Sequence, residues 1–476
     1  MNFRRWVVFT FLIHVLVVLL DKGGGLVLYL LCSTEQDQHG KSNIVATLPF
    51  VLGAIANLGL ATALVYFVRR GMHSAQTCFE TSMAVALVWG GLIASLAAGF
   101  LLVALPAIDP TWVLDPWMVL PVCAAVPLLL VASYANSTQL ATDRVGDYGV
   151  VHLVTSLGFL PAFFGFFFLF GGSVQAGDVP RGVVWGRLVS TVVVALLALW
   201  LVRKVVTLRV KVHRKFLGEA LRYGWKANLT STLTYLNHRI DLIVLFAVYF
   251  ATQKANGIVP KVAEGLANTQ VAFYGMAVTW AELVWHFPEA MRDLFFSKVA
   301  GSSHEEARSM TPVLARLGFA ISLCGALAIL LLMDPMMELV TMLASKPASV
   351  WSDGWSPAVG DALLWLVPGT VAFTVSKILQ ADLAARDQLQ TCVNAQLSVF
   401  VTMVALDLVW IPAHGATGAA AASTVAYVVG TIWTLVAYSR QTGTPAWRCL
   451  FVHPSDFRYI RDIAAAIVGK LRRKRA

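Results

Sequence analysis

The run LGFAISLCGALAILLLM, residues 317–333, decides the class of fold, because it contains no charged residue and is almost entirely apolar. A helix crosses the hydrocarbon core of a bilayer with about 20 predominantly apolar residues. A similar run, VVFTFLIHVLVVLL (7–20), stands near the N-terminus. Over all 476 residues 58% are hydrophobic and only 13% are charged, whereas a soluble domain carries roughly 25% charged residues. The sequence therefore predicts a helical membrane protein.

Twelve segments of the chain are predicted to be transmembrane helices. They are 6–32, 43–68, 79–107, 117–141, 148–171, 182–202, 222–250, 268–296, 312–333, 358–384, 389–411 and 416–438. The predicted fold is all-α, a polytopic membrane protein with about 12 transmembrane helices in two six-helix lobes around a central cavity. The basic connection at 203–221 separates the two sets of six, which sets the expected lobes at 1–205 and 206–438. A basic cytoplasmic tail that can form an amphipathic helix follows at 439–476.

Lysine and arginine are distributed unequally between the two sides of the membrane. With the N-terminus inside, the inner connections carry 25 basic residues and the outer connections carry 5, namely Lys41, Arg181, Lys254, Lys261 and Lys346. Basic loops favour the cytoplasmic side, so both termini are predicted to be cytoplasmic. Anionic lipid headgroups beside the inner loops account for the net charge of +10, and no nucleic-acid partner is expected.

The short outer connections and the scattered cysteines do not indicate an enzyme or a metal site. The largest outer connections, 251–267 and 334–357, are too short for a soluble catalytic domain. The second of them is expected to hold a short interfacial helix with Trp351 and Trp355. The six cysteines are scattered and form no CxxC pair, so neither a disulfide framework nor a zinc site is indicated. We expect no enzyme activity, no catalytic residue, no metal and no cofactor.

One predicted span, which contains KANLTSTLTYLNHRID (226–241), is unusually polar. One face of this helix carries residues spaced four, four, three and four apart, namely Lys226, Thr230, Thr234, Asn237 and Asp241. The other side is polar as well, with Asn228, Thr232, Tyr235 and Arg239. A helix of this kind cannot face lipid, and in a membrane protein it indicates a path for a polar substrate. Either polar side can line that path.

Other charged residues lie inside predicted spans. Each either has a structural role, by pairing or by snorkelling to the interface, or lines a cavity. Asp21 in the first span either pairs with Lys22 or Arg239 to fix packing between the lobes, or lines a cavity as a proton or cation site. Arg187 lies a little inside the outer face, where snorkelling to the interface explains it simply. Lys377 lies nine residues, about 13 Å, from Arg386 at the inner end, which favours a place in the cavity.

Acidic residues of the later spans extend this set. Glu282, His286 and Glu289 follow one another at i, i+4 and i+7, but they lack the HExxH order of a zinc site. A proton relay, or a set of partners for basic residues, fits them better. Asp407 is expected near the interface at the outer end of its span.

Cations dominate the embedded charges, and this indicates an anionic substrate. The embedded cations are Lys22, Arg187, Lys226, Arg239 and Lys377. Arginine offers a planar fork to phosphate and lysine offers a point charge. The hydroxyls and amides between 228 and 237 suit the hydroxyl groups of a sugar. A lipophilic cationic drug would instead need an acidic, aromatic chamber.

Several segments resemble the polysaccharide transporter family. These are lipid-linked oligosaccharide flippases of the O-antigen type, within the multidrug/oligosaccharidyl-lipid/polysaccharide exporter superfamily. The segments are LLDKGGGLVLYLL (19–31), ANLGLATALVYFVRRG (56–71), YGWKANLTSTLTYLNHRIDLIVL (223–245), FYGMAVTWAELVWHFPEAM (273–291), WLVPGTVAFTVSKILQADLAARD (365–387) and GATGAAAASTVAYVVGT (415–431). Their order and spacing cover nearly the whole chain. The chain departs from the family in the longer, polar STEQDQHGKS loop (33–42) and in KANGIVPKVAEGLANTQ (254–270), which leaves the particular substrate open.

The resemblance implies two six-helix lobes, a central cationic cavity and alternating access. It also implies transport of undecaprenyl-pyrophosphate-linked sugars from the inner to the outer leaflet of a bacterial-type inner membrane, for cell-surface polysaccharide and lipopolysaccharide synthesis. Arg239 and Asp241 match the motif that ends the seventh span, Lys377 falls in the tenth-span region, and no family residue matches Arg187. Polysaccharide-assembly proteins are then possible partners, beside membrane lipids and the lipid-linked oligosaccharide itself.

These inferences set the expected site. The expected substrate-binding residues are Lys226, Arg239, Lys377, Arg187, Asn237, Thr230 and Thr234, and the expected residues for coupling to a cation or proton are Asp21, Asp241 and Glu282. Two alternatives stay open at this point. One is a cation-coupled multidrug exporter of the same superfamily, and the other is an integral-membrane glycan polymerase or glycosyltransferase.

Overall fold

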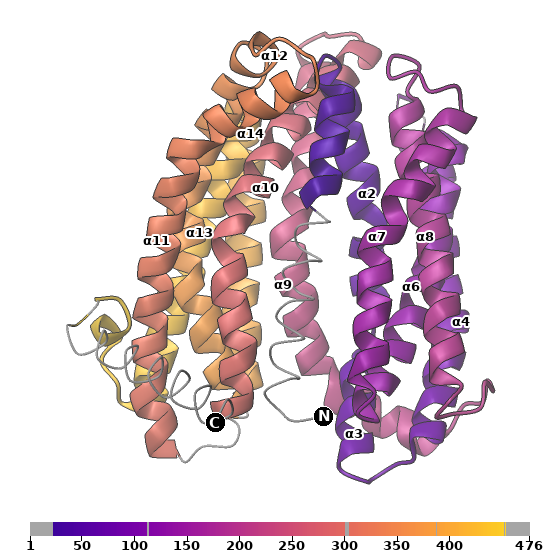
Figure 1. Ribbon diagram of the computed structural model, residues 1–476, viewed down its shortest axis with the longest axis vertical. Helices are drawn as coiled ribbons and strands as arrows, with labels where there is room; N and C mark the ends of the chain where they lie inside the picture. Colours follow the sequence, from indigo (N-terminus) through magenta and orange to yellow (C-terminus); the bar gives the residue numbers. More distant parts are fainter. Residues whose placement is uncertain (1–21, 112–113, 300–303, 387, 452, 454–476) are drawn as a thin grey trace, which may run out of the picture.

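The computed structural model describes residues 22–111, 114–299, 304–386, 388–451 and 453. Within these ranges the side chains of 145, 227, 286–299, 304–310 and 385 are not described. Every regular element of the described residues is a helix, and the long helices run roughly parallel to one another (Figure 1). An all-α membrane fold is therefore confirmed for this part of the chain.

The helices follow the apolar segments of the sequence. After a short helix at Lys22–Cys32, they are α2 (Gln36–Ala56), α3 (Leu60–Arg69), α4 (Ala75–Gly99), α5 (Leu105–Ile108), α6 (Pro116–Ala141), α7 (Val145–Leu169), α8 (Asp178–Val202), α9 (Arg214–Ala255), α10 (Pro260–Val299), α11 (His304–Leu343), α12 (Ser349–Ser352), α13 (Ser356–Ala385) and α14 (Leu389–Thr442). Local signals start them where expected. Asp115, for example, accepts a hydrogen bond from the backbone N–H of Trp117, with Pro116 at the first position of α6.

Eight of the described helices are long and apolar enough to cross a membrane, or nine if the bent pair of α2 and α3 counts as one span. The bend between α2 and α3 is 52°. The first predicted span is described only from Lys22 onward. The eighth predicted span falls on α10, which is helical but too polar to be among the eight.

The eleventh and twelfth predicted spans lie on the two parts of α14, which break at Gly415. This glycine has φ 54° and ψ −125°, so the two parts are separate helices joined at a sharp turn. The side chain of Gln270 in α10 stabilises the turn, because its Oε1 accepts a hydrogen bond from the N–H of Ala416 at 2.8 Å. A Cβ at Gly415 would stand 2.3 Å from that same oxygen. Only glycine fits here, both for its backbone angle and for this contact.

The long helices form two groups side by side. Figure 1 shows α4, α6, α7 and α8 on one side and α10, α11, α13 and α14 on the other, with α2 and α9 between them. Each group has its own hydrophobic core. One is built around Tyr134, Phe79 and Leu64, and the other around Tyr274, Trp351 and Phe373.

Helix α9 belongs to both groups. Its first turns pack in the first core, where Tyr223 stacks on Tyr66 at 4.0 Å and Phe216 contacts Phe67. Farther along, Leu242 and Leu245 lie in the second core. The predicted boundary at 205/206 therefore precedes α9, and the helix itself passes from one group to the other.

Helix α2 closes the molecule against α10 at one end. A Cβ on Gly40 would stand 1.6 Å from the backbone oxygen of Asn268, so the two backbones are in direct contact. One turn away, Lys41 pairs with Glu264 at 3.0 Å. A further link at this end joins Lys254, at the end of α9, to Asp109 after α5, and this hydrogen bond lowers the pKa of the Asp109 carboxyl to about 2.

The connections at this end are shorter than the sequence indicated. Helices α9 and α10 extend into the predicted connection 251–267 and leave only 256–259 between them. A short helix is present in the second connection, as α12. Trp351 and Trp355 are fully buried and contact the ring of Tyr29 edge-on at 5.7 and 5.1 Å. The two tryptophans therefore pack with Tyr29 in a core between separate helices and are not exposed at the surface.

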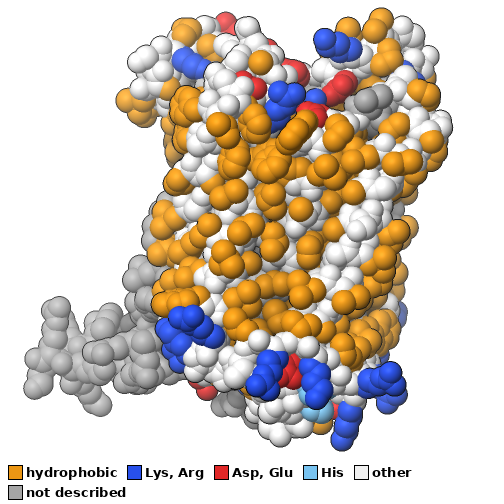
Figure 2. Space-filling view, turned by 90° about the vertical axis from the view of Figure 1, so that its right-hand side faces the viewer, with side chains coloured by type: hydrophobic (Ala, Val, Ile, Leu, Met, Phe, Trp, Pro, Cys, Tyr) orange, Lys and Arg blue, Asp and Glu red, His pale blue; other side chains and the backbone are white. Residues whose placement is uncertain are grey.

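The outer surface carries a broad apolar band. Figure 2 shows hydrophobic side chains across the middle of the face, with charged side chains gathered at its two ends. Helix α4 contributes Leu87, Val88, Leu92 and Leu96, and the π-helical turn that follows it (Phe100–Ala104) contributes Phe100 and Val103, all exposed. An apolar surface of this extent is typical of contact with lipid.

We predict that a side chain at Gly40 forces α2 away from α10. The variant Gly40→Val should lower the free energy of unfolding by about 1–3 kcal/mol, because a packed backbone contact must open. Thermal unfolding in detergent measures it. Gly91→Val in α4 is the matched control, because a Cβ there meets nothing within 4 Å. Equal loss in the two variants would contradict the backbone contact.

Candidate functional site

Three charged side chains from three elements meet inside the membrane-spanning part of the molecule. Glu282 of α10 contacts Lys22 of the first helix, with Nζ to Oε2 at 2.9 Å. The same carboxylate contacts Arg239 of α9, with Nη2 to Oε1 at 3.0 Å and to Oε2 at 3.1 Å. One negative charge therefore serves two positive charges.

The three side chains are only partly covered. Relative exposures are 31% for the side chain of Arg239, 21% for Lys22 and 13% for Glu282. Removing ions from water costs several kcal/mol each, which pairing and hydrogen bonds must offset. Glu282 supplies that pairing, while the two cations keep an accessible edge.

A second acidic group lies two residues from Arg239. Asp241 is buried and accepts hydrogen bonds from the Tyr274 hydroxyl and from the N–H of Leu242, the latter at 2.8 Å. The Tyr274 hydroxyl also contacts Ser423 of α14 at 3.0 Å. Asp241 is thus held by α10 and α14 and does not pair with Arg239 directly.

Asp407 is the unexpected member of this region. The sequence placed it at the interface, but the structure buries it completely in the first part of α14, which corrects that expectation. Neither of its carboxylate oxygens has a hydrogen-bond partner among the described residues. It lies near enough to Asp241 for the two carboxylates to interact electrostatically. Two buried carboxylates in one region cannot both carry a full charge cheaply.

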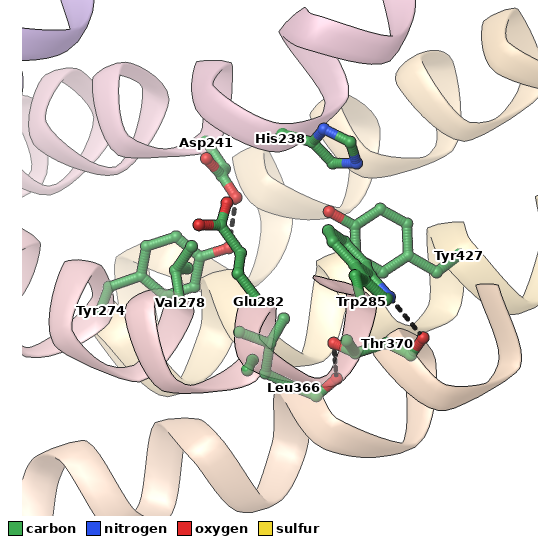
Figure 3. Close-up of a pocket in the computed structure, with 10 residues that line it drawn as sticks. His238, Asp241, Tyr274, Val278, Glu282, Trp285, Leu366, Thr370 and Tyr427 are labelled. Atoms are coloured by element: carbon green, nitrogen blue, oxygen red, sulfur yellow. Dashed lines mark hydrogen bonds between the residues drawn. The ribbon is translucent and has the colours of Figure 1, made fainter. Parts of the chain in front are cut away.

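Asp241, Tyr274 and Glu282 help to line a small pocket between four helices. Figure 3 shows His238 and Asp241 on α9, Glu282 and Trp285 on α10, Thr370 on α13 and Tyr427 on α14 around it. Its volume is about 10 Å³, close to the minimum that holds one water molecule. The conformation described is therefore closed around this point.

Lys377 approaches the same region from α13. Its Nζ lies 3.6 Å from the ring centre of Trp285 and 6.0 Å from that of Phe373, and the side chain is buried. Trp285 is held in place because its Nε1–H donates to the Thr370 carbonyl at 2.8 Å. A cation on the face of a tryptophan is stabilised by about 2 kcal/mol when it is removed from water.

A chain of buried amides and hydroxyls ties the helices of this group together. Asn237 donates to Gln396 at 2.8 Å, Gln396 donates to Gln380 at 2.9 Å, and Gln380 donates to Ser376 at 2.8 Å. Asn237 is fully buried, so it links α9 to α14 and presents no surface to a ligand in this conformation.

The remaining expected residues lie apart from this pocket. Thr230 and Thr234 are half-buried, two turns and one turn before Asn237 respectively, and each donates to the carbonyl four residues earlier. Lys226 is the first residue of the polar face of α9, and its Nζ lies over the ring of Trp225 at 5.5 Å. Arg187 belongs to the other helix group and lies over Phe159 at 4.1 Å and Phe50 at 5.7 Å. Asp21 and the side chains of His286 and Glu289 lie outside the described residues.

Sequence reasoning left out part of the pocket. Tyr274, Trp285 and Tyr427 are ordinary aromatic residues of apolar spans, and nothing in their spacing marks them. Asp407 carried a usable signal, since it is a carboxylate within a predicted span. The sequence identifies Lys22 as an embedded cation, but only the fold shows that it contacts Glu282, 260 residues away.

Comparison with known proteins identifies the fold. No protein-family profile and no curated protein sequence matches the chain. Among solved structures, the lipid II flippase MurJ in an inward closed conformation matches with a TM-score of 0.66 and 14% identity, over 97% of this chain and 96% of that chain. The chain has the fold of MOP superfamily transporters.

Two MATE family transporters described as members of the MOP superfamily have the same fold in different conformations. An inward-facing multidrug resistance MATE family transporter matches with a TM-score of 0.64 and 13% identity, over 91% of this chain and 99% of that chain. An outward-facing one matches with a TM-score of 0.54 and 14% identity, over 90% and 98%. The fold is therefore more similar to the inward-facing structure of the two.

We predict that Glu282→Gln destabilises the protein, because Lys22 and Arg239 lose their shared counter-ion. The loss in the free energy of unfolding should be about 3 kcal/mol, the lower end for a broken buried pair. Chemical unfolding in detergent measures it, and the double variant Arg239→Gln/Glu282→Gln should recover part of it. In the control Glu264→Gln an exposed pair is lost, which should cost less than about 1 kcal/mol. An additive double variant would mean that Arg239 and Glu282 are not coupled.

Proposed function

We propose that the protein is a flippase that moves an anionic, lipid-linked oligosaccharide across the membrane by alternating access. The observation that carries the proposal is the sharing of one carboxylate, Glu282, by Lys22 and Arg239 within the membrane. A polyprenyl-pyrophosphate headgroup supplies the missing negative charge, and a guanidinium binds phosphate oxygens in a bidentate manner. Lys377, held on Trp285, provides a third cation nearby.

The conformation described suits loading from the inner side. At the opposite end the backbones of Gly40 and Asn268 are in contact, and Tyr29 packs among Trp351 and Trp355. The greater similarity to an inward-facing than to an outward-facing transporter agrees with this closure. The headgroup would enter between the helix groups from the cytoplasmic side, with the lipid tail remaining in the bilayer.

Glu282 acts in this scheme as an internal substitute for the substrate anion. While the site is empty, its carboxylate neutralises Lys22 and Arg239. An arriving phosphate competes for the partly exposed edges of the same two cations. Release of Glu282 would loosen the contacts of α10 with α9 and with the first helix. The substrate would then bind one of the two conformations more tightly than the other and shift the equilibrium between them.

Coupling to a proton or cation would act through Asp241 and Asp407. With both carboxylates charged, the acidic groups of this region balance Lys22, Arg239 and Lys377. Once a proton or a metal cation neutralises one of them, the region becomes net positive and binds an anion more tightly. Cation and anion then favour each other's binding by the same factor. We also propose that Asp21 takes part in coupling. The residues proposed to contact the glycan are Thr230, Thr234, Asn237 and Lys226.

A multidrug exporter is the second candidate, and one observation favours it. The pocket of Figure 3 combines carboxylates with Trp285 and Tyr427, which suits an organic cation. The protein's own cations already take those places, however. Lys377 lies on the Trp285 ring, and Glu282 is bound by Lys22 and Arg239. We therefore favour the anionic substrate, and no observation favours the glycan polymerase or glycosyltransferase.

Reconstituted transport tests the function. In proteoliposomes, wild-type protein should translocate a fluorescent polyprenyl-pyrophosphate oligosaccharide, and Arg239→Ala should reduce the rate at least about 10-fold, because a charge-assisted contact to phosphate is lost. The control Arg440→Ala removes an exposed cation at the end of α14, outside the site, and should keep the wild-type rate. Efflux of organic cations without glycan-lipid movement would establish the second candidate instead. Unchanged glycan-lipid transport by Arg239→Ala would refute the charge-binding site.

Coupling is tested separately at Asp407. Asp407→Asn keeps the shape of the side chain but can neither bind a proton in this pH range nor carry charge. Transport by this variant should lose its response to imposed pH or Na⁺ gradients while substrate binding stays within about 3-fold of wild type. Asp353→Asn, an exposed site in the connection before α13, is the control. A gradient response that survives in Asp407→Asn would remove Asp407 from the coupling scheme.

A further inference from the structure

The connection between α8 and α9 carries an unusual surface. Residues 203–213, RKVVTLRVKVH, contain no regular secondary structure, and we call them the basic strap. Its basic residues are Arg203, Lys204, Arg209 and Lys211, and its exposed apolar residues are Val205, Leu208, Val210 and Val212. The last three are 52%, 60% and 50% exposed. A water-facing loop has no reason to present three large apolar side chains in five residues.

The basic strap is fixed in place on α4. Gln76 binds both backbone groups of Thr207, accepting from its N–H at 2.7 Å and donating to its carbonyl at 2.9 Å. The N–H of Lys211 donates to the carbonyl of Glu80 at 3.4 Å, and His213 contacts the Glu80 carboxylate at 2.7 Å. Val206 is buried in the first core. These contacts hold residues 206, 207, 211 and 213, so the apolar residues between them stay outward.

The position of the basic strap is at the rim of the lipid-facing surface. Helix α4 begins the candidate span Ala75–Ile108, and none of the most apolar 18-residue window of that span is buried, although the first turns of α4 are. The strap lies beside the first turns of α4, and the exposed apolar residues of that helix begin at Leu87, about two turns beyond Glu80. Figure 2 shows Lys and Arg side chains gathered directly below the apolar band on this side of the molecule.

We propose that the basic strap binds the anionic phospholipids of the inner leaflet. Leu208, Val210 and Val212 would enter the boundary between headgroups and acyl chains, while Arg209 and Lys211 contact the phosphates. Each basic residue near an anionic surface strengthens binding by about 1 kcal/mol, which is about 5-fold. The apolar side chains lie about two turns along α4 from its exposed apolar surface, and this position at the rim favours a bilayer over an acidic protein, which would bind from the aqueous side.

The basic strap also connects the two helix groups. Val202 ends α8 in the first group, and Arg214 begins α9, which crosses to the second. A lipid-anchored strap therefore holds the start of α9 at the level of the headgroups. We infer that the anionic lipid content of the inner leaflet changes the stability of the protein through this connection.

Lipid titration of the full-length protein tests the proposal. Phosphatidylglycerol, added to protein in neutral detergent, should raise the unfolding temperature more than phosphatidylcholine does. Arg209→Gln/Lys211→Gln should weaken the apparent affinity for phosphatidylglycerol roughly 10-fold or more, since about 5-fold is lost for each charge. Leu208→Ser/Val210→Ser/Val212→Ser should weaken it as well, with an effect that persists in high salt, whereas salt screens the charge contribution.

The matched control is Arg440→Gln/Arg448→Gln, which removes two exposed positive charges outside the strap. It should keep the phosphatidylglycerol response within about 2-fold of wild type. Loss of the response in this control, or its persistence in both strap variants, would overturn the proposal. So would an equal response to soluble glycerol phosphate, which would identify a free-phosphate site. Preference of the strap for an acidic peptide with no lipid preference would identify a protein surface instead. All surfaces changed here are exposed, and circular dichroism confirms folding of each variant.

Discussion

Ionised groups in a membrane interior must be paired within the protein, because lipid offers them no water. Among the described residues the pairing is uneven, since one carboxylate, Glu282, contacts both Lys22 and Arg239. The packing of the second helix group depends on that carboxylate, which joins the first helix, α9 and α10. The same unevenness leaves positive charge available at partly exposed side chains. A single constraint thus supports both the fold and the proposed substrate site.

The polar character of α9 follows from its course between the two helix groups. A helix that packs on one core at its beginning and on another at its end meets protein on several sides. Asn237 donates a hydrogen bond to α14 and Asp241 accepts one from α10, whereas Arg239 pairs with Glu282. The two polar sides identified from the sequence therefore have different neighbours, one inside the second group and one at its edge toward the first helix.

The helical membrane class was predictable because it depends on local composition. Apolar segments near 20 residues long can do little else in a bilayer, so helices appear where the runs lie. The ends of the helices were less predictable. Helices α9 and α10 continue past the apolar runs because they pack on each other and on α2, and Trp351 and Trp355 entered a core with Tyr29 for the same reason. Packing decides these positions, and a single sequence does not show it.

Composition and apolar run lengths are enough to predict a helical membrane protein rich in intramembrane cations, because those properties are sums over neighbouring residues. Which charges meet depends on how the helices pack. Lys22 and Glu282 are 260 residues apart, and Asp407 is brought near Asp241 by the packing of α14 on α9. Electrostatic energy depends on distance in space and on burial. Separation along the chain gives neither the distance between two charges nor their burial. The charged site therefore cannot be located without the packing of the helices.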